Sequence, residues 1–249
     1  MAEQRLLAGF HAVTARLRHQ PDSVREIYVD TRRHDARLRE LSAMAESRGV
    51  RVVAVDETRL EGLAGGARHQ GVVARVVAPV HPEDLDELLK GLSQPAFLLL
   101  LDGVTDPHNL GACLRVADAM GVHAVIVPKD RSAGLSPVVA KVASGAAESV
   151  PLISVTNLVR TIEELKAAGI WVWGAAEAGD RSLLETQLDG PIAWALGAEG
   201  TGLRRLTREH CDALARIPMF GQVESLNVSV ATALCLYETR RQREAAGRP

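Results

Sequence analysis

The stretch AFLLLLDGVTDPHNLGACLR, residues 96–115, decides the fold class. It opens with the longest apolar run of the chain, residues 96–101, which is typical of a buried strand. Asp106 and Pro107 then supply a capping residue and a proline at the first helical position, a combination that starts helices. The stretch therefore predicts a buried strand that leads through a short loop into a helix, as in α/β folds.

The same alternation continues to the C-terminus. Further strand-like runs lie between helical segments at 123–127, 150–155, 170–173, 192–196 and 214–218. This order predicts a mainly parallel sheet covered by helices. Ligands of such sheets bind at the carboxyl ends of the strands. We therefore expect the functional site in the loops that begin at Asp102, Gly197 and Pro218.

The first third of the chain reads as a smaller α/β unit. Helical spacing at 10–18, a strand around 27–29, a helix at 35–47 and strands at 50–55 and 71–78 follow one another. Prolines 79, 82 and 95 then surround a short acidic amphipathic stretch, which is typical of a linker. The sequence thus predicts domains at 1–78 and 95–249, joined by a linker at 79–94.

Composition narrows the class of protein. The chain has 249 residues, 47% hydrophobic and 24% charged, which fits a soluble protein of one or two domains. No apolar run is long enough to cross a bilayer and the N-terminus lacks a signal pattern, so we expect a cytoplasmic location. Cys113, Cys211 and Cys235 are too widely spaced to suggest a thiolate zinc site or a disulfide framework, and we expect them to be reduced and buried.

Charge is divided unevenly along the chain. Residues 1–78 contain 13 arginines and no lysine against 10 acidic residues, whereas the remainder has 16 basic and 21 acidic residues. Arginine offers a planar fork that matches phosphate and stacks on bases. The basic first third therefore fits a nucleic-acid surface, and composition alone fits a solvated arginine-rich surface equally well.

The helix predicted after Asp106 carries two candidate site residues. Asn109 lies near its open amide end, and Arg115 lies two turns further along. Alternatively, Arg115 pairs with Asp118 on the helix surface and has no part in a site.

Two later stretches also place polar groups beside flexible backbone. LGAEGTGL, residues 196–203, has three glycines after an apolar strand, so its backbone can approach a ligand closely. It matches neither a dinucleotide fingerprint nor a Walker sequence, and Glu199 could instead bond to Arg204 or Arg205. In RIPMFGQVESLNVSVA, residues 216–231, a strand ends and a helix begins near Ser225 to Asn227, with Ser225 as a candidate cap. No Ser/His/Asp or Cys/His set accompanies these loops, which disfavours an acyl-enzyme mechanism.

Together and in this order, the three stretches resemble the motifs of the SpoU-like branch of the SPOUT methyltransferases. The resemblance spans 95–241 and includes KVASGAAESVP at 141–151. The first third resembles the family's N-terminal RNA-binding domain, with GFHAV at 9–13 and HQGVV at 69–73. Val116 departs from the family pattern, in which Ser or Thr often follows the motif arginine, and we expect this change to affect packing only.

The resemblance implies a C-terminal α/β domain tied into a trefoil knot, a homodimer, and S-adenosylmethionine as the methyl donor. The implied reaction is methylation of the ribose 2′-hydroxyl of a guanosine in 23S ribosomal RNA, with no metal and no membrane involved. The residues that would bind the cofactor are Leu196, Gly197, Gly200, Ile217, Met219, Ser225 and Leu226. The residues that would act on the substrate are Asn109, Arg115, Glu199, Ser225 and Asn227.

Physical chemistry refines the roles that the resemblance implies. A guanidinium is almost never neutral in a protein, so we interpret Arg115 as a phosphate anchor and a stabiliser of developing alkoxide charge rather than as a base. Asn109 would orient the ribose or Arg115, and Glu199 would position Arg115 or receive the proton. Candidate RNA contacts in the first third are His11, Arg16, Arg18, Arg32 and Arg33.

Two alternatives remain at this point. A transfer-RNA ribose methyltransferase shares the catalytic motifs, but many such enzymes lack a complete N-terminal domain of this kind. An inactive RNA-binding homologue would be expected to have lost Asn109, Arg115 or Asn227, and all three are present.

Overall fold

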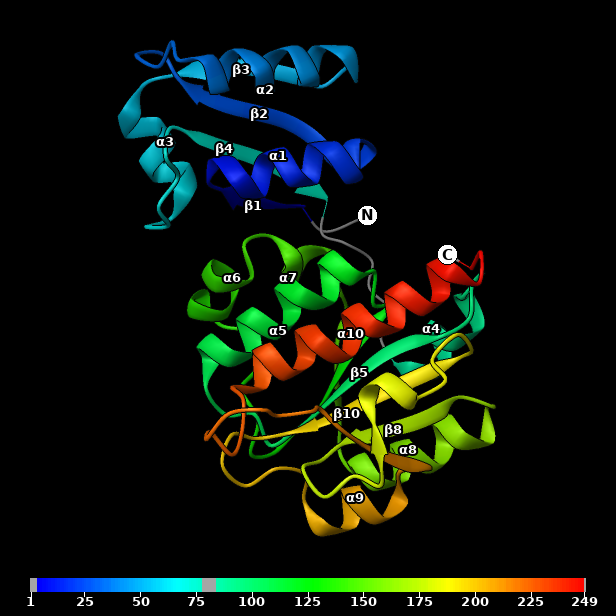
Figure 1. The fold of residues 1–249 in the computed structure, drawn as a ribbon. Helices are drawn as coiled ribbons and strands as arrows, with labels where there is room; N and C mark the ends of the chain where they lie inside the picture. The colour runs from blue at the N-terminus through cyan, green and yellow to red at the C-terminus, as the bar shows by residue number, and fades with distance from the viewer. Residues whose placement is uncertain (1–3, 78–83, 249) are drawn as a thin grey trace. The chain divides into compact units, whose positions relative to one another are not determined.

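The computed structural model describes residues 4–77 and 84–248, which divide into two compact units (Figure 1). The first unit spans 1–80 and the second 81–249. Each unit has its own buried clusters of apolar side chains.

The first unit is a four-stranded sheet with helices on both faces (Figure 1). Its elements are β1 (Gln4–Ala8), α1 (Phe10–His19), η1 (Pro21–Ser23), β2 (Val24–Asp30), α2 (Ala36–Ser47), β3 (Arg51–Val55), α3 (Glu57–Ala64) and β4 (Val72–Val77). The strand order is β1-β4-β2-β3, in which only the β2 and β3 pair is parallel. The sequence pattern did not reveal β1 and α3.

Alternation along β2 explains why helices cover both faces of this sheet. Ile27 and Val29 join the cluster formed with α1 and α2, whereas Tyr28 joins the cluster around Leu60 of α3. Because successive strand residues point to opposite faces, each face of the strand is apolar and needs cover.

The second unit is a seven-stranded sheet in which every described strand pair is parallel. The strand order is β7-β6-β5-β10-β8-β11-β9. The strands are β5 (Phe97–Asp102), β6 (Ala124–Pro128), β7 (Leu152–Val155), β8 (Trp171–Ala175), β9 (Arg181–Ser182), β10 (Ile192–Gly197) and β11 (Ala213–Arg216). The helices are α4 (Leu85–Gly91), α5 (Pro107–Met120), α6 (Pro137–Ala143), α7 (Ala146–Ser149), α8 (Leu158–Ala167), η2 (Leu183–Glu185), α9 (Arg205–His210) and α10 (Val228–Ala245).

Two helical layers cover this sheet. Phe97, Leu99 and Leu101 of β5 pack in the cluster that includes α5 and α10, and Leu98 and Leu100 pack in the cluster that includes α4 and α8. Figure 1 shows α5 and α10 lying side by side across one face of the sheet. All five of these strand residues are fully buried, which explains why the strand reads as one continuous apolar run.

Helix α4 lies inside the range that the sequence predicts to be a linker. Its Leu85 and Leu88 are buried in the same cluster as Ala96 and Leu98. This part of the range therefore packs with the second unit, while 79–83 lies outside the described residues. The domain limits themselves stay a prediction, and so does the knot.

Candidate functional site

A cavity of about 720 Å³ lies at the carboxyl ends of β8, β10 and β11. Its wall includes Ala175 at the end of β8, the whole of 196–203, and Ile217 just after β11. A cavity of this size is typical of a site for a small molecule or cofactor. It occupies the position that the parallel sheet predicts for a ligand.

The glycine-containing loop after β10 is folded tightly on itself. The backbone N–H of Gly202 donates to the carbonyl of Ala198 at 2.9 Å. A Cβ atom at Gly197 would lie 1.9 Å from the carbonyl carbon of Gly202, so no side chain fits at that position. The loop backbone therefore packs against itself at Gly197, and this packing requires a glycine there.

A buried carboxylate fastens the far end of this loop. Asp102, the last residue of β5, is 1% exposed and pairs in register with Gly197. Its Oδ2 accepts a hydrogen bond from the backbone N–H of Arg204 at 2.9 Å, and its Oδ1 lies 3.4 Å from Nη1 of the same residue. Both ends of the loop are thus held at the carboxyl end of β5.

Three polar side chains, from the first turn of α5, the loop after β10 and the cap of α10, meet beside the cavity. The Nδ2 amide of Asn227 donates to Oδ1 of Asn109 at 2.9 Å and to Oε2 of Glu199 at 3.2 Å. The Asn227 Oδ1 accepts from the backbone N–H and the hydroxyl of Ser229, at 2.9 and 2.6 Å. Asn227 is therefore the residue that joins the cluster.

Helix starts position two members of this cluster. Asp106 caps α5 through the N–H of His108, with Pro107 at the first helical position, as the sequence predicts. The helix α10 begins within the predicted region, and its cap is Asn227 rather than the candidate Ser225. Ser225 lies two residues before the cap and lines the cavity.

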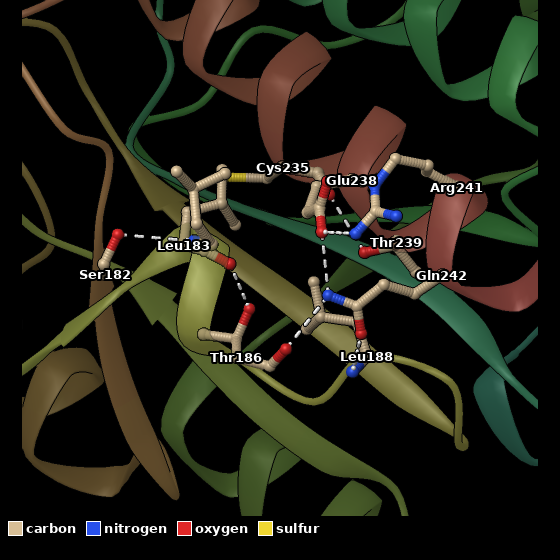
Figure 2. A network of polar contacts seen from close by, with 10 residues as sticks. Ser182, Leu183, Thr186, Leu188, Cys235, Glu238, Thr239, Arg241 and Gln242 are labelled. Carbon is tan, nitrogen blue, oxygen red and sulfur yellow. Dashed lines mark hydrogen bonds and ion pairs between the residues drawn. The ribbon is translucent and has the colours of Figure 1, made fainter. Parts of the chain in front are cut away.

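The C-terminal half of α10 is anchored away from the site (Figure 2). Gln242 donates to the carbonyl of Thr186 at 2.9 Å and accepts from the N–H of Leu188 at 2.8 Å. Glu238 accepts from Gln242 at 2.8 Å and from Arg241, whose bonded guanidinium lowers the pKa of that carboxyl. Because both ends of the helix are bonded, the position of its Asn227 cap is well defined.

The seven residues expected to bind the cofactor, Ser225 among them, all line the one cavity, together with Glu199. Asn109 and Asn227 join Glu199 through the hydrogen bonds above. Arg115 is exposed and has no hydrogen bond or ion pair to any described residue. The alternative pairing with Asp118 does not occur, since that carboxylate accepts from the Ser149 hydroxyl.

The alternative pairings of Glu199 with arginine are also absent. Arg204 is held by Asp102, and Arg205 donates to both carboxylate oxygens of Glu209. Sequence reasoning missed Glu177, Glu224 and Arg208 in the cavity wall. Glu177 follows the carboxyl end of β8, so the rule that ligands bind at strand ends could have identified it.

The cysteines offer no nucleophile. Burial raises the pKa of Cys113 to about 11 and that of Cys211 to about 12, so both are thiols at neutral pH. Cys113 and Cys235 are buried as expected, but Cys211 is only half-buried.

Across residues 4–77 and 84–248, no group of three or more His, Cys, Asp or Glu residues is arranged to hold a metal ion. No helix of that part of the chain has the length and apolar character to span a membrane.

The candidate RNA contacts of the first unit differ in availability. Arg16 is 5% exposed and donates to Ser23 and to the carbonyl of Val77, so its selection as a surface contact is wrong. Arg32 is ion-paired to Asp30 and Glu57. Arg33 lies over the ring of Phe10 and pairs with Asp35. His11 and Arg18 are exposed.

Comparison with known proteins gives two family matches. Residues 96–237 match the SpoU rRNA Methylase family. Residues 6–82 match the family described as RNA 2′-O ribose methyltransferase substrate binding.

Curated relatives match over almost their full length. The chain is 59% identical to the 23S rRNA (guanosine-2′-O-)-methyltransferase RlmB of Ralstonia nicotianae, covering 98% of each chain. It is 53% identical to the protein of the same name in Escherichia coli, covering 96% of this chain and 98% of that one.

Solved structures agree with these matches. The SpoU methyltransferase AviRb from Streptomyces viridochromogenes, in complex with the cofactor AdoMet, is 28% identical with a TM-score of 0.71, covering 97% of this chain and 91% of that chain. The TrmH/SpoU tRNA modifying enzyme of A. aeolicus is 30% identical with a TM-score of 0.58, and it covers only 63% of this chain.

Proposed function

The chain belongs to the SpoU rRNA methylase family, and from this membership we propose that it transfers a methyl group from S-adenosylmethionine to the ribose 2′-hydroxyl of a guanosine in 23S ribosomal RNA. The observation that carries the proposal is the cavity beside the Asn109, Glu199 and Asn227 cluster. It places a ligand-sized space directly next to polar groups that can hold a hydroxyl.

The residues of the cavity fit S-adenosylmethionine. Gly200 and Gly202 have no side chain and open space beside them, so a flat ring can approach the backbone there, and Leu196, Ile217 and Leu226 supply apolar surface. Glu177, Glu199 and Glu224 supply negative charge that complements a sulfonium. When bound, the cofactor supplies an electrophilic methyl carbon.

The chain's own residues would align the ribose and stabilise charge. In the proposed reaction the 2′-oxygen would bond to the methyl carbon as the carbon–sulfur bond of the bound cofactor breaks, and the sulfur would keep the electron pair. Alignment of the two reactants provides much of the benefit in such a displacement. Asn109 would orient the ribose, Glu199 would receive the hydroxyl proton, and Arg115 would anchor phosphate and stabilise negative charge on oxygen. Ser225 and Asn227 would complete the pocket.

Ribosomal rather than transfer RNA is favoured as the substrate. The tRNA modifying relative covers only 63% of this chain, whereas the ribosomal RNA relatives cover both units. The first unit would select the RNA through phosphate contacts and RNA shape.

We also propose that the protein is a cytoplasmic homodimer with a knotted second unit. Exposed apolar side chains at Val230, Leu234 and Tyr237 follow one face of α10, as a helical interface requires. Leu234→Arg is expected to shift the protein from dimer to monomer in sedimentation velocity. If Leu234→Arg remained a dimer, the interface between the two copies would not include this face of α10.

The proposed reaction is tested on ribosomal RNA from a strain that lacks this protein. Purified protein and labelled S-adenosylmethionine should restore one 2′-O-methylguanosine in 23S ribosomal RNA, located by mapping of 2′-O-methyl sites. Asn227→Ala should bring methylation close to background while the protein stays folded. Label appearing in transfer RNA, or on a base instead of a ribose, would overturn the assignment.

A further inference from the structure

A second cavity, of about 590 Å³, lies over the carboxyl ends of β5, β6 and β7. We call it the arginine cavity because its wall includes Arg131, Arg204 and Arg205. The loop at 198–204 separates it from the cofactor cavity, since Leu203 lines one and Arg204 the other. Two spaces of ligand size are therefore adjacent along one edge of the sheet.

The two cavities differ in charge. The arginine cavity has three arginines against Asp102 and Asp130. The cofactor cavity has three glutamates against Arg208. The second unit has an excess of acidic residues. The positive charge of the arginine cavity therefore does not follow from the overall charge of that unit. A cationic cofactor fits the acidic cavity, and an anion fits the other.

Arg204 is held in place at this cavity. Asp102 is buried and binds both the backbone N–H and the guanidinium of Arg204. The Arg204 guanidinium also lies over Gly103, where a Cβ would come within 3.0 Å of Nη2. Its side chain is nevertheless 45% exposed. A pre-positioned guanidinium loses little conformational entropy when it binds an anion.

Arg131 is the uncommitted cation of the cavity. It is exposed and has no hydrogen bond or ion pair within the described chain, whereas Arg205 is held by Glu209. Arg131 has a left-handed backbone with φ of 57°, which is uncommon for a residue other than glycine. The loop is fixed nearby, because the Ala133 N–H donates to the carbonyl of Val104 at 2.8 Å. The start of α8 at Leu158 adds the positive end of a helix dipole.

We propose that the arginine cavity binds a backbone phosphate of the RNA substrate, with Arg131 and Arg204 as its contacts. The inference rests on the proposed function, because it takes the substrate to be RNA. A guanidinium matches two phosphate oxygens through parallel hydrogen bonds. Such a contact beside the cofactor loop would hold the strand while the ribose is positioned on the other side of that loop.

The test measures how RNA binding depends on salt. Binding of a 23S ribosomal RNA transcript to the full-length protein is measured by filter retention over a series of KCl concentrations. For Arg131→Gln we expect weaker binding at low salt and a slope of log K against log[KCl] that is shallower by about one. Arg131→Lys should keep most of the slope. Calorimetry should show unchanged affinity for S-adenosylmethionine in both variants.

Arg160→Gln is the matched control. Arg160 lies on α8 and is exposed, but it pairs with Glu164 at 2.9 Å and does not line the cavity. Its removal should leave the slope unchanged.

Three outcomes would overturn the inference. An unchanged slope for Arg131→Gln, in a protein that still methylates RNA, rejects the phosphate site and leaves the proposed function intact. A shift of Arg131→Gln from dimer to monomer in sedimentation velocity with an unchanged slope would assign the cavity to a contact between copies. Failure of the wild-type protein to bind or methylate the transcript would reject the proposed function itself, and the inference with it.

Discussion

Arg115 is a predicted catalytic residue that lies outside the hydrogen-bonded cluster of Asn109, Glu199 and Asn227. It is exposed, and its removal breaks no hydrogen bond or ion pair within the described part of the chain. If it anchors phosphate and stabilises charge, Arg115→Ala should lose on the order of a hundredfold in single-turnover methyl transfer. Arg115→Lys keeps the charge and should retain part of the rate. Calorimetry should show unchanged cofactor affinity in both variants.

Among the residues that the structure describes, Arg115 has no hydrogen-bond or ion-pair partner, so the test separates a role in catalysis from a role in stability. Because no ion pair is broken, neither variant should change the unfolding temperature. A near-normal rate for Arg115→Ala would make it a plain surface residue, and complete loss in Arg115→Lys would point to a role that only a guanidinium can fill.

His123 gives a second prediction, which concerns stability. Its Nδ1 accepts a hydrogen bond from the backbone N–H of Phe97 at 3.0 Å. Burial, together with the charges of Arg243 and Arg240, lowers the pKa of this imidazole below its ordinary value of 6.5. The unfolded chain therefore binds the proton first as pH falls. The contribution of neutral His123 to the free energy of unfolding is therefore complete above pH 6.5, and it is lost as the pH falls toward the lowered pKa.

The replacement His123→Asn isolates this effect. Its amide oxygen can accept the same hydrogen bond and does not titrate near neutrality. The fall in unfolding temperature between pH 7 and pH 5 should be smaller in His123→Asn than in the wild type. The exposed His108→Asn serves as the control and should follow the wild type. Equal acid sensitivity of His123→Asn and the wild type would show that His123 contributes nothing.

At the scale of elements, the loop after β10 sets a strict test of the cofactor cavity. A Cβ at Gly197 would collide with the Gly202 backbone at 1.9 Å, and a backbone atom cannot rotate away as a side chain can. Gly197→Ala should therefore displace the loop and weaken S-adenosylmethionine binding by at least about tenfold, measured by calorimetry. Gly221→Ala is the control, because a Cβ there meets nothing within 4 Å. If Gly197→Ala bound S-adenosylmethionine with wild-type affinity, this loop would not be part of the cofactor site.

The elements that the sequence predicts best are those whose pattern is set by burial or capping. Strand β5 is apolar from Phe97 to Leu101 because both of its faces are covered, and α5 begins where Asp106 and Pro107 place it. The short edge strands β1 and β9 have no such pattern. The sequence does not decide the cap of α10, because Ser225 and Asn227 are both good capping residues and the choice depends on tertiary bonds from Asn227 to Asn109 and Glu199.

In the candidate site, too, the sequence predicts the features set by local pattern and misses those set by tertiary contacts. The loops at the carboxyl ends of strands could be located from the order of the elements. The site residues within these loops were identified from the resemblance to the family's motifs. The Asp102 clamp and the arginine cavity could not be found this way, because they depend on which strands become neighbours across the sheet. Asp102 and Gly197 are paired in register although 95 positions separate them in the sequence.

At the scale of the whole molecule, chemistry and selection of the RNA are assigned to different units. The buried clusters of the first unit contain none of the residues that form those of the second. Every residue of the cofactor cavity lies in the second unit, while the excess of arginine over acidic residues lies in 1–78. A fragment of residues 81–249 should therefore fold and bind S-adenosylmethionine with the affinity of the full chain.

The same fragment should be a poor methyltransferase. Phosphate contacts supply much of the affinity for RNA, so removing the basic unit should lower kcat/KM for ribosomal RNA by roughly tenfold or more. Circular dichroism and cofactor calorimetry on the fragment control for misfolding. The loss should be largest at low salt and should shrink as salt rises, because the phosphate contacts of the removed unit are themselves weakened by salt. If the fragment methylated the same guanosine at full efficiency, selection would reside in the second unit, and the arginine cavity would be the first place to look for it.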